Sequence, residues 1–280
     1  MEKIRLIDVG ARNGIHERWD RYHAQIEVRA FEPYPSECDR LNLLPSPYPI
    51  RYLPVALGEK DGERATLYIC RQPGCSSLLR PNMSLCGGFA YSRNMEITGE
   101  HPIVLTRLDK VCADFPPDVL KIDTQGTELF ILRGAGNLLD TTLAVELEVE
   151  FIEQYTGQPL FADVDAFMRS KGYTLRGLRR DYWRNHASYR HAYGGQLIHG
   201  DALYLRPAAM NSPKGHVILA AYRQYDLLAS LGASKYIPIE TWTIQVLGKL
   251  LSGYPNRELR RFVDRVRPAT ASDWHDPDFF

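Results

Sequence analysis

The sequence lacks an excess of charge of either sign and lacks any long apolar run. Its 280 residues contain 34 lysines and arginines against 34 aspartates and glutamates, so no global field would attract nucleic acid or an anionic membrane. No stretch is apolar for long enough to span a bilayer, and the chain passes directly into "KIRLIDVG" without a basic leader and an apolar run. We therefore expect no membrane span, no nucleic-acid partner and a protein that is not exported.

Cysteine is scarce, and none of the cysteines is arranged in the pairs of a zinc site. The five cysteines are odd in number and show no C-x-x-C spacing, which favours reduced thiols in a cytoplasmic protein. Internal repeats and low-complexity tracts are missing as well, and this excludes a solenoid.

Short apolar runs alternate with helical patterns up to about residue 207. We predict helices over residues 15–25, over 34–44 with a Ser36 cap, within "TELFILRGAGNLL" and over 163–171. The predicted strands are "IRLIDV", "IEVRAFEP", "IRYLPVALG", "RATLYI" with an antiparallel partner, "HPIVLTRL", "DVLKID", "TTLAVELEVEF", "YTLRGL" and "DALYLRP". This order predicts a doubly wound, mostly parallel α/β domain over residues 1–207.

Two segments differ from that alternation. Residues 71–100 carry many turn-forming residues and little periodicity, which indicates a long loop with a function. Residues 208–280 contain three helical patterns separated by glycine and proline, and we predict a helical extension there. Its apolar faces would pack on the main domain or form a contact between two copies of the chain.

The first predicted strand runs into the turn "DVGARNG", where a doubly wound sheet binds its ligand. Gly10 and Gly14 bracket this turn, but the middle glycine of a dinucleotide fingerprint is missing. Asp8 repels phosphate and attracts an ammonium group. Glu32 ends the second strand, where an acid accepts hydrogen bonds from ribose. S-adenosylmethionine satisfies both acids, although each acid alone could equally cap a turn.

The motifs "IDVGARNG", "FEPYPSECDRL", "VALGEKDGERATLYI", "SSL", "TRLD" and "LKIDTQGTELFILRGAGNLL" resemble, in that order, the FkbM-type methyltransferases that use S-adenosylmethionine. The resemblance covers about residues 4 to 180 and is most specific at "LKIDTQGTE". It implies a seven-stranded class I methyltransferase (Rossmann-like) fold and O-methylation of a small molecule, a sugar or glycan, or a polyketide-like product. The pair Arg12 and Asn13 departs from the small residue that is usual in the family.

The resemblance also implies residue roles. Asp8, Gly10 and Gly14 would surround the methionyl end of the cofactor, and the backbone near Ala56 and Leu57 would hold adenine. Asp123 would close the site beneath the sulfonium. The full expected cofactor set is Asp8, Gly10, Ala11, Asn13, Gly14, Glu32, Pro33, Ala56, Leu57 and Asp123.

Methyl transfer to a hydroxyl needs alignment and a proton acceptor. Asp123 is the first candidate base, followed by His199 and its neighbour Asp201, although a lone histidine is more often structural. Glu128 could begin a helix, because a carboxylate suits the positive end of the helix dipole. The row Glu146, Glu148 and Glu150 could suggest magnesium, but such alternation usually marks a solvated or arginine-paired edge, and we expect no metal.

The stretch from 178 to 196 mixes arginine and histidine with tyrosine and tryptophan. It could bind the acceptor or pack as a loop, in preference to RNA. We therefore expect an S-adenosylmethionine-dependent O-methyltransferase. The alternatives are a non-catalytic interaction module on the same fold and a nicotinamide-dependent oxidoreductase, which the missing glycine disfavours.

Overall fold

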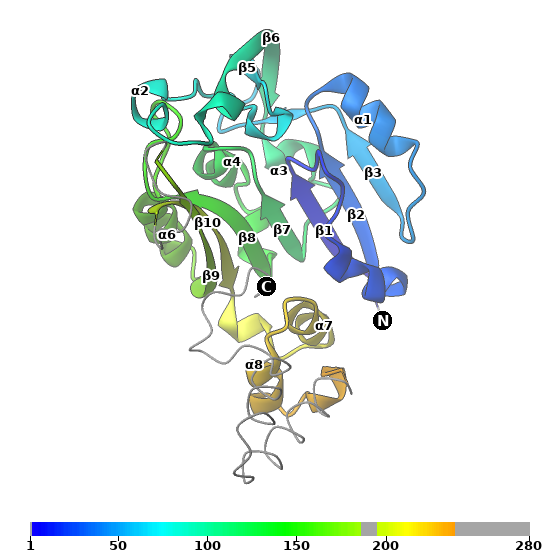
Figure 1. Cartoon of the computed structure of the whole chain (residues 1–280). Coiled ribbons are helices and arrows are strands. Elements are labelled where there is room, and N and C mark those ends of the chain that lie inside the picture. Colours follow the sequence, from blue (N-terminus) through cyan, green and yellow to red (C-terminus); the bar gives the residue numbers. More distant parts are fainter. Residues whose placement is uncertain (1, 186–194, 239–280) are drawn as a thin grey trace, which may run out of the picture. The chain divides into compact units, whose positions relative to one another are not determined.

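The fold is that of a computed structural model, which describes residues 2–185 and 195–238 (Figure 1). Two compact units divide the chain, Met1–Met210 and Asn211–Phe280. Two helical patterns predicted for residues 240–253 and 256–266 lie outside the described residues, as does part of the arginine-rich stretch, residues 186–194. The division into a cofactor domain over 1–207 and a helical extension over 208–280 stays a prediction.

A seven-stranded sheet forms the centre of the first unit (Figure 1). The strand order is β3-β2-β1-β7-β8-β10-β9. The first five of these strands are parallel, and β10 is antiparallel to both of its neighbours. The bounds are β1 Ile4–Val9, β2 Ile26–Phe31, β3 Ile50–Leu53, β7 Val119–Ile122, β8 Ala144–Glu150, β9 Thr174–Trp183 and β10 Gln196–Leu205. This confirms the predicted mostly parallel, seven-stranded class I methyltransferase sheet.

One face of the sheet carries the main hydrophobic core. Alternate residues of the central strands, such as Ile7, Leu120 and Val145, are fully buried on this face. The helices α3 (Leu108–Val111), α4 (Glu128–Gly134), α5 (Leu138–Thr141) and α6 (Phe161–Ser170) supply further residues of the same cluster. Figure 1 shows α3, α4 and α6 on the same side of the sheet. This packing fixes the strand ends that build the site.

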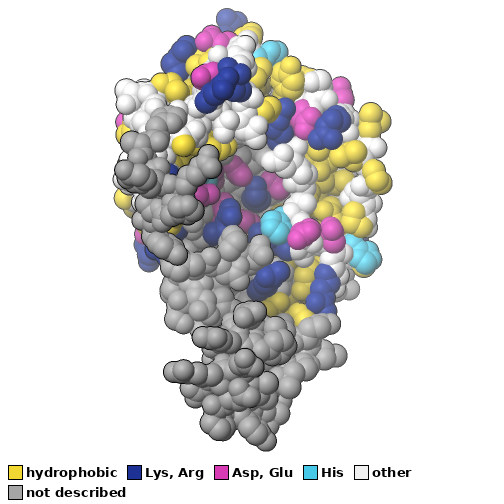
Figure 2. All heavy atoms as spheres, viewed as in Figure 1, with side chains coloured by type: hydrophobic (Ala, Val, Ile, Leu, Met, Phe, Trp, Pro, Cys, Tyr) yellow, Lys and Arg dark blue, Asp and Glu magenta, His cyan; other side chains and the backbone are white. Residues whose placement is uncertain are grey.

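The opposite face carries charged side chains at its centre. Because side chains alternate along a strand, Asp8, Lys121 and Glu146 project away from the hydrophobic core. Figure 2 shows acidic, basic and histidine side chains gathered in a hollow near the middle of the viewed face. The charged face is defined by Asp8 on β1, Lys121 on β7, Glu146, Glu148 and Glu150 on β8, and His199 and Asp201 on β10.

A separate three-stranded sheet lies between β3 and β7 in the sequence. Its order is β4-β6-β5, with β4 at Ala56–Leu57, β5 at Arg64–Cys70 and β6 at Ile97–Thr106. The prediction of one strand over "IRYLPVALG" is therefore wrong, because Pro54 offers no N–H for a continuous ladder. The segment between β5 and β6 holds η2 (Pro73–Cys75), α2 (Met83–Cys86) and η3 (Ser92–Met95).

Several helices differ from their predicted form. The first is a 3-10 segment, η1 (Glu17–Gln25), and α1 spans Pro35–Asn42 with Tyr34 as its N-cap. The predicted Ser36 cap is wrong, since Pro35 already occupies the first helical turn. The long helix over "TELFILRGAGNLL" is divided into α4 and α5, because Gly136 between them has a φ of 53°.

The second unit contains short helices in its described part. These are α7 (Pro213–Ala221), α8 (Tyr225–Ser230) and the 3-10 turn η5 (Ser234–Tyr236). Ser212 caps α7 by accepting a hydrogen bond from the Gly215 N–H at 3.0 Å. In the part of the chain that the structure describes, no helix combines the length and the apolar character that a membrane span needs.

Candidate functional site

A cavity of about 500 Å³ opens at the carboxyl ends of β1, β2 and β7. A doubly wound sheet binds its ligands at this edge, where the strand order reverses. The cavity is lined by residues from the two sheets and the loops between them: Val9, Gly10, Arg12, Asn13, Phe31, Glu32, Pro33, Tyr34, Val55, Ala56, Leu57, Leu67, Ile69, Pro73, Gly74, Ser76, Ser77, Leu78, Asp123, Thr124, Gln125, Thr127 and Ile131.

Seven of the predicted cofactor residues lie in the wall of this cavity: Gly10, Asn13, Glu32, Pro33, Ala56, Leu57 and Asp123. Three others, Asp8, Ala11 and Gly14, do not line it. The predicted base His199 does not line it either. The first turn therefore contributes Gly10, Arg12 and Asn13 to the cavity wall, whereas Asp8 on β1 does not line it.

Gly10 is required by the geometry of the first turn. Its φ of 84° favours glycine, and a Cβ at this position would lie 1.9 Å from the backbone oxygen of Asp123. The N–H groups of Gly10 and Ala11 both donate to the carbonyl of Phe31. The turn is thus held between the ends of β2 and β7, and only a residue without a side chain fits there.

Asp8 is buried on the charged face beside Lys121. The Lys121 Nζ lies 3.6 Å from the Asp8 Oδ1 and 3.5 Å from the Asp123 Oδ2. Burial raises the pKa of Asp8 to about 6, although the neighbouring ammonium opposes this change. Lys121 therefore joins the two acids that the resemblance places near the methionyl end and the sulfonium of the cofactor. This lysine lies in the motif "LKIDTQGTE", but the sequence predicted no role for it.

Glu32 lies where β2 ends and faces the cavity. Its Oε1 accepts a hydrogen bond from the Tyr34 N–H at 2.9 Å, and the Arg12 guanidinium lies 3.9 Å away. Burial raises the pKa of the Glu32 carboxyl. One carboxylate oxygen is thus held by the backbone, so the group has a fixed direction from which it can accept hydrogen bonds from a ligand.

The part of the cavity wall that β4 and β5 supply is apolar. Ala56 and Leu57 of β4 line it together with Leu67 and Ile69 of β5. A flat aromatic ring such as adenine suits a wall of this kind. Ser77 connects the wall to the end of β7, because its hydroxyl donates to the backbone oxygen of Gln125 at 2.7 Å.

Asp123 follows β7 directly and is the acid that borders both the cavity and the charged face. Burial alone would raise the pKa of its carboxyl, but Lys121 and a hydrogen bond from Gln125 outweigh this effect and hold it below its usual value. The Gln125 Nε2 donates to the Asp123 Oδ1 at 3.0 Å. Asp123 is therefore ionised at neutral pH and is oriented by two neighbours.

The loop after Asp123 is built around the carboxylate of Glu128. This side chain accepts hydrogen bonds from the N–H of Thr124 at 2.6 Å and from that of Gly126 at 3.0 Å, and Glu128 begins α4 as predicted. Gln125 has a φ of 60°, a conformation that is uncommon outside glycine. The strained loop places Thr124, Gln125 and Thr127 in the cavity wall.

The acidic row on β8 is buried, so its interpretation as a solvated edge is wrong. β8 lies between β7 and β10 inside the sheet. Glu146 pairs with Arg18 at 3.4 Å, and the Glu148 Oε1 lies 3.2 Å from the His199 Nδ1. Burial raises the pKa of both Glu148 and Glu150. Periodicity alone could not distinguish an edge strand from a central one.

His199 and Asp201 are held on β10 by charged partners. Burial alone would lower the pKa of His199, but its hydrogen bond to Glu148 raises it above the usual value. The Arg179 Nε donates to Asp201 at 2.7 Å, so at least this arginine of the predicted acceptor stretch binds a carboxylate of its own chain.

The five cysteines are free and buried, which agrees with the predicted reduced thiols.

Comparison with known proteins gives one family match. The model described as the methyltransferase FkbM domain matches residues 8–175. No curated protein matches the chain. Among solved structures, the chain is similar to the magnesium protoporphyrin IX methyltransferase of Synechocystis PCC 6803 with bound SAM (9% identity, 73% of this chain and 71% of that one covered, TM-score 0.38). It is also similar to the precorrin-6y C5,15-methyltransferase of Geobacter metallireducens GS-15 (12% identity, 73% and 81% covered, TM-score 0.36).

Proposed function

The chain belongs to the FkbM methyltransferase family, and from this premise we propose that its S-adenosylmethionine-dependent methyl transfer is directed to a hydroxyl oxygen of a polar small molecule or glycan. The observation that carries the proposal is the position of Asp123. This carboxylate lies in the wall of the cavity and also beside Lys121 of the charged face. A donor in the cavity and a hydroxyl on that face would meet at this residue.

The lining of the cavity supports a cofactor position like the one expected from the sequence. Glu32 would accept hydrogen bonds from the ribose hydroxyls, and the wall at Ala56 and Leu57 would hold adenine. Asn13 and the backbone at Gly10 would face the methionyl end. Because Asp8 does not line the cavity, we propose that it acts on the amino-acid end through Lys121 and the first turn, by charge and not by contact.

Asp123 is our proposed general base. The transfer moves a methyl group from the sulfonium to the hydroxyl oxygen, and the hydroxyl proton must leave to a nearby acceptor. An ionised carboxylate at the strand end can receive that proton and can also attract the positive sulfonium. His199 stays the second candidate, but its Nδ1 already faces Glu148.

The charged face supports a polar acceptor. Groups such as Glu146 and Asp201 offer acceptor oxygens, and Lys121 offers donors, within the same unit as Asp123. These groups are already paired within the chain, and hydroxyl-rich molecules such as sugars could add hydrogen bonds to them, whereas an apolar acceptor would remove their water without replacing its hydrogen bonds. This argument favours a sugar or glycan over a polyketide-like product.

The remaining predictions are kept as proposals. They are a cytoplasmic location, the absence of a nucleic-acid partner, and a contact between two copies of the chain through the helices after residue 207. A non-catalytic module on the same fold is the alternative function. It would bind the cofactor without transferring its methyl group.

We expect S-adenosylhomocysteine and S-adenosylmethionine to bind the protein, and NAD not to bind, because the turn lacks the middle glycine that lets the backbone approach a pyrophosphate. Isothermal titration calorimetry with the three ligands measures this directly. Incubation with S-adenosylmethionine labelled in its methyl group and a fractionated polar extract then tests transfer. Binding without any labelled product in the extracts would favour the non-catalytic alternative, and tight NAD binding would contradict the proposal.

We expect Glu32→Ala to weaken S-adenosylhomocysteine binding by about 1–3 kcal/mol, because ribose hydroxyls would lose a charged acceptor in a desolvated site. Glu27→Ala is the matched control, since Glu27 begins the same strand and pairs with Arg5 at 3.1 Å outside the cavity. Calorimetry on both variants measures the difference. Equal affinities in the two folded variants would show that Glu32 only caps the turn at Tyr34.

A further inference from the structure

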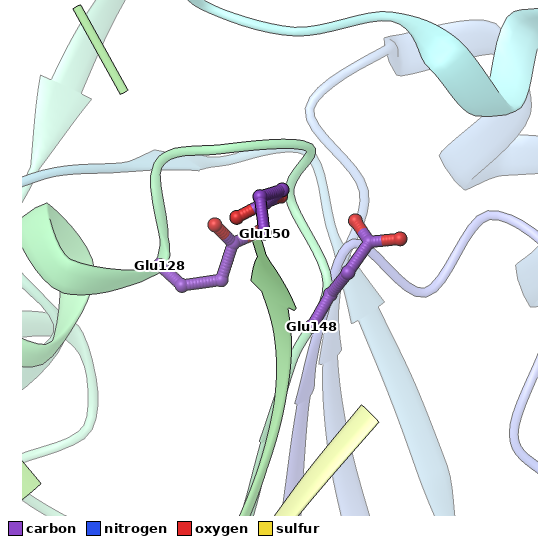
Figure 3. A group of neighbouring side chains, drawn as sticks. All are labelled: Glu128, Glu148 and Glu150. Carbon is purple, nitrogen blue, oxygen red and sulfur yellow. The ribbon is translucent and has the colours of Figure 1, made fainter. Parts of the chain in front are cut away.

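Three glutamates converge behind the loop that follows Asp123. Glu128 begins α4, and Glu148 and Glu150 lie two residues apart on β8. One carboxylate oxygen from each lies within 4.8 Å of the other two. Figure 3 shows the carboxylates of Glu128 and Glu150 facing each other, with Glu148 further along the same strand as Glu150.

These side chains are buried in the fold. Glu128 is 2% exposed, Glu148 is 9% exposed and Glu150 is 1% exposed. A buried carboxylate is costly unless a cation or several hydrogen bonds compensate its charge. Three of them in one place therefore need a cation, hydrogen bonds or protonation to offset their charge, and burial raises the pKa of both Glu148 and Glu150.

Two of the three carboxylates have partners. Glu128 accepts hydrogen bonds from the backbone N–H groups of Thr124 and Gly126. Glu148 lies 3.2 Å from the His199 Nδ1 and accepts a hydrogen bond from the Gln125 Nε2 at 2.5 Å. Both residues keep lone pairs that these contacts do not use.

Glu150 is different. Within residues 2–185 and 195–238, its Oε1 is buried and has no hydrogen-bond partner. Among the basic side chains of the charged face, Lys121 is engaged by Asp8 and Asp123, and His199 contacts Glu148. Glu150 thus presents one buried carboxyl oxygen without a partner, close to two further carboxyl groups.

We propose that Glu128, Glu148 and Glu150 bind a divalent cation of the hard class, such as Mg²⁺, Ca²⁺ or Mn²⁺. Such ions prefer carboxylate oxygens at about 2.0–2.6 Å, so two ligand oxygens on opposite sides of one ion lie about 4–5 Å apart. The upper limit of 4.8 Å on the separations of the three oxygens is compatible with one shared ion. The Oε1 of Glu150 is the oxygen with no other role, and water would complete the coordination.

The position of the site gives it a role. The ion would bind Glu128, which holds the backbone of the loop at Thr124 and Gly126. This loop carries Gln125, which donates to Asp123. The three glutamates are therefore positioning residues, because none of them lines the cavity. The inference does not depend on the acceptor or on the proposed transfer to oxygen.

The test uses the full chain after removal of metal with a chelator. We expect the apo protein to take up about one Mn²⁺ per chain, measured by electron paramagnetic resonance of free Mn²⁺ and by elemental analysis after desalting. Its melting temperature should rise with the concentration of Mn²⁺, Mg²⁺ or Ca²⁺, because an ion that binds only the folded state stabilises it. None of these measurements requires an active enzyme.

Glu150→Gln should weaken Mn²⁺ binding by at least about a hundredfold, because it replaces the free ligand oxygen by a neutral amide of the same shape. Glu146→Gln is the matched control. It removes a buried carboxylate from the same face of β8, but Glu146 pairs with Arg18 and lies outside the cluster.

Three results would overturn the proposal. The wild-type protein could show no bound Mn²⁺ and no response of its melting temperature to any of the three ions. Glu150→Gln could bind Mn²⁺ as tightly as the wild type, or Glu146→Gln could lose binding to the same extent as Glu150→Gln. If Glu150→Gln does not fold, the proposal is tested by the Mn²⁺ stoichiometry of the wild type and by the Mn²⁺ affinity of Glu148→Gln.

Discussion

Asp123→Asn is expected to lower the rate of methyl transfer by about a hundredfold or more, which is the usual contribution of a general base. The substitution keeps the shape of the side chain and an oxygen that can accept the hydrogen bond of Gln125. It removes the negatively charged carboxylate oxygen that would accept the hydroxyl proton. The measurement is the initial rate of label transfer to the acceptor fraction found in the extract experiment.

Binding measurements separate the two roles that Asp123 could have. If its charge attracts the sulfonium, Asp123→Asn weakens binding of S-adenosylmethionine more than that of S-adenosylhomocysteine, because only the former is positively charged. If it accepts the proton, both affinities stay close to those of the wild type while the rate falls. His199→Gln is the comparison. If His199→Gln lowers the rate of methyl transfer and Asp123→Asn does not, the general base is His199 and not Asp123.

Gly10→Ala is expected to destabilise the fold by about 2–5 kcal/mol. The left-handed backbone accounts for about 1–2 kcal/mol. The remainder comes from the new Cβ, which would lie 1.9 Å from the Asp123 oxygen and must push the two loops apart at a cost of about 1–3 kcal/mol. Unfolding in urea, followed by circular dichroism, measures the free energy of unfolding.

Gly62→Ala provides the control for this prediction. Gly62 also has a positive φ, 76°, but nothing lies within 4 Å of the position of its Cβ. The loss of unfolding free energy in Gly62→Ala therefore measures the backbone strain alone. The additional loss in Gly10→Ala measures the cost of the close contact between its Cβ and the Asp123 oxygen. Equal losses of stability would mean that the loops at Gly10 and Asp123 separate without cost.

Much of the main sheet could be predicted because its strands are short apolar runs that end in turns. A doubly wound sheet was predicted, and in the structure β1 pairs with both β2 and β7, which places Gly10 beside Asp123. The position of Glu32 in the site could also be predicted from the sequence, because this acid directly follows the second strand. Each of these features depends on local pattern and on a common topology.

Other features depend on which strands become neighbours, and a local pattern does not contain that information. Alternating acids on β8 suggested an edge, yet β10 returns antiparallel and covers it. Lys121 is an ordinary lysine in a strand until Asp8 lies beside it. The apolar wall from β5 was also missed, because Leu67 and Ile69 face the cavity only after β5 pairs with β6.

The position of β1 in the sheet also has a consequence for how the chain folds. Leu6 pairs with Val119, and Val9 pairs with Ile122, so the two strands of this central ladder are separated in the sequence by the whole of the small sheet. Pairings between such distant residues form slowly, because the entropy of closing a long loop is lost before any contact is gained. A growing chain would thus have no complete cofactor cavity until Ile131, the last residue in its lining, has been synthesised. Binding of S-adenosylhomocysteine should therefore appear late in refolding, after the helical signal, and it would report when the centre of the sheet closes.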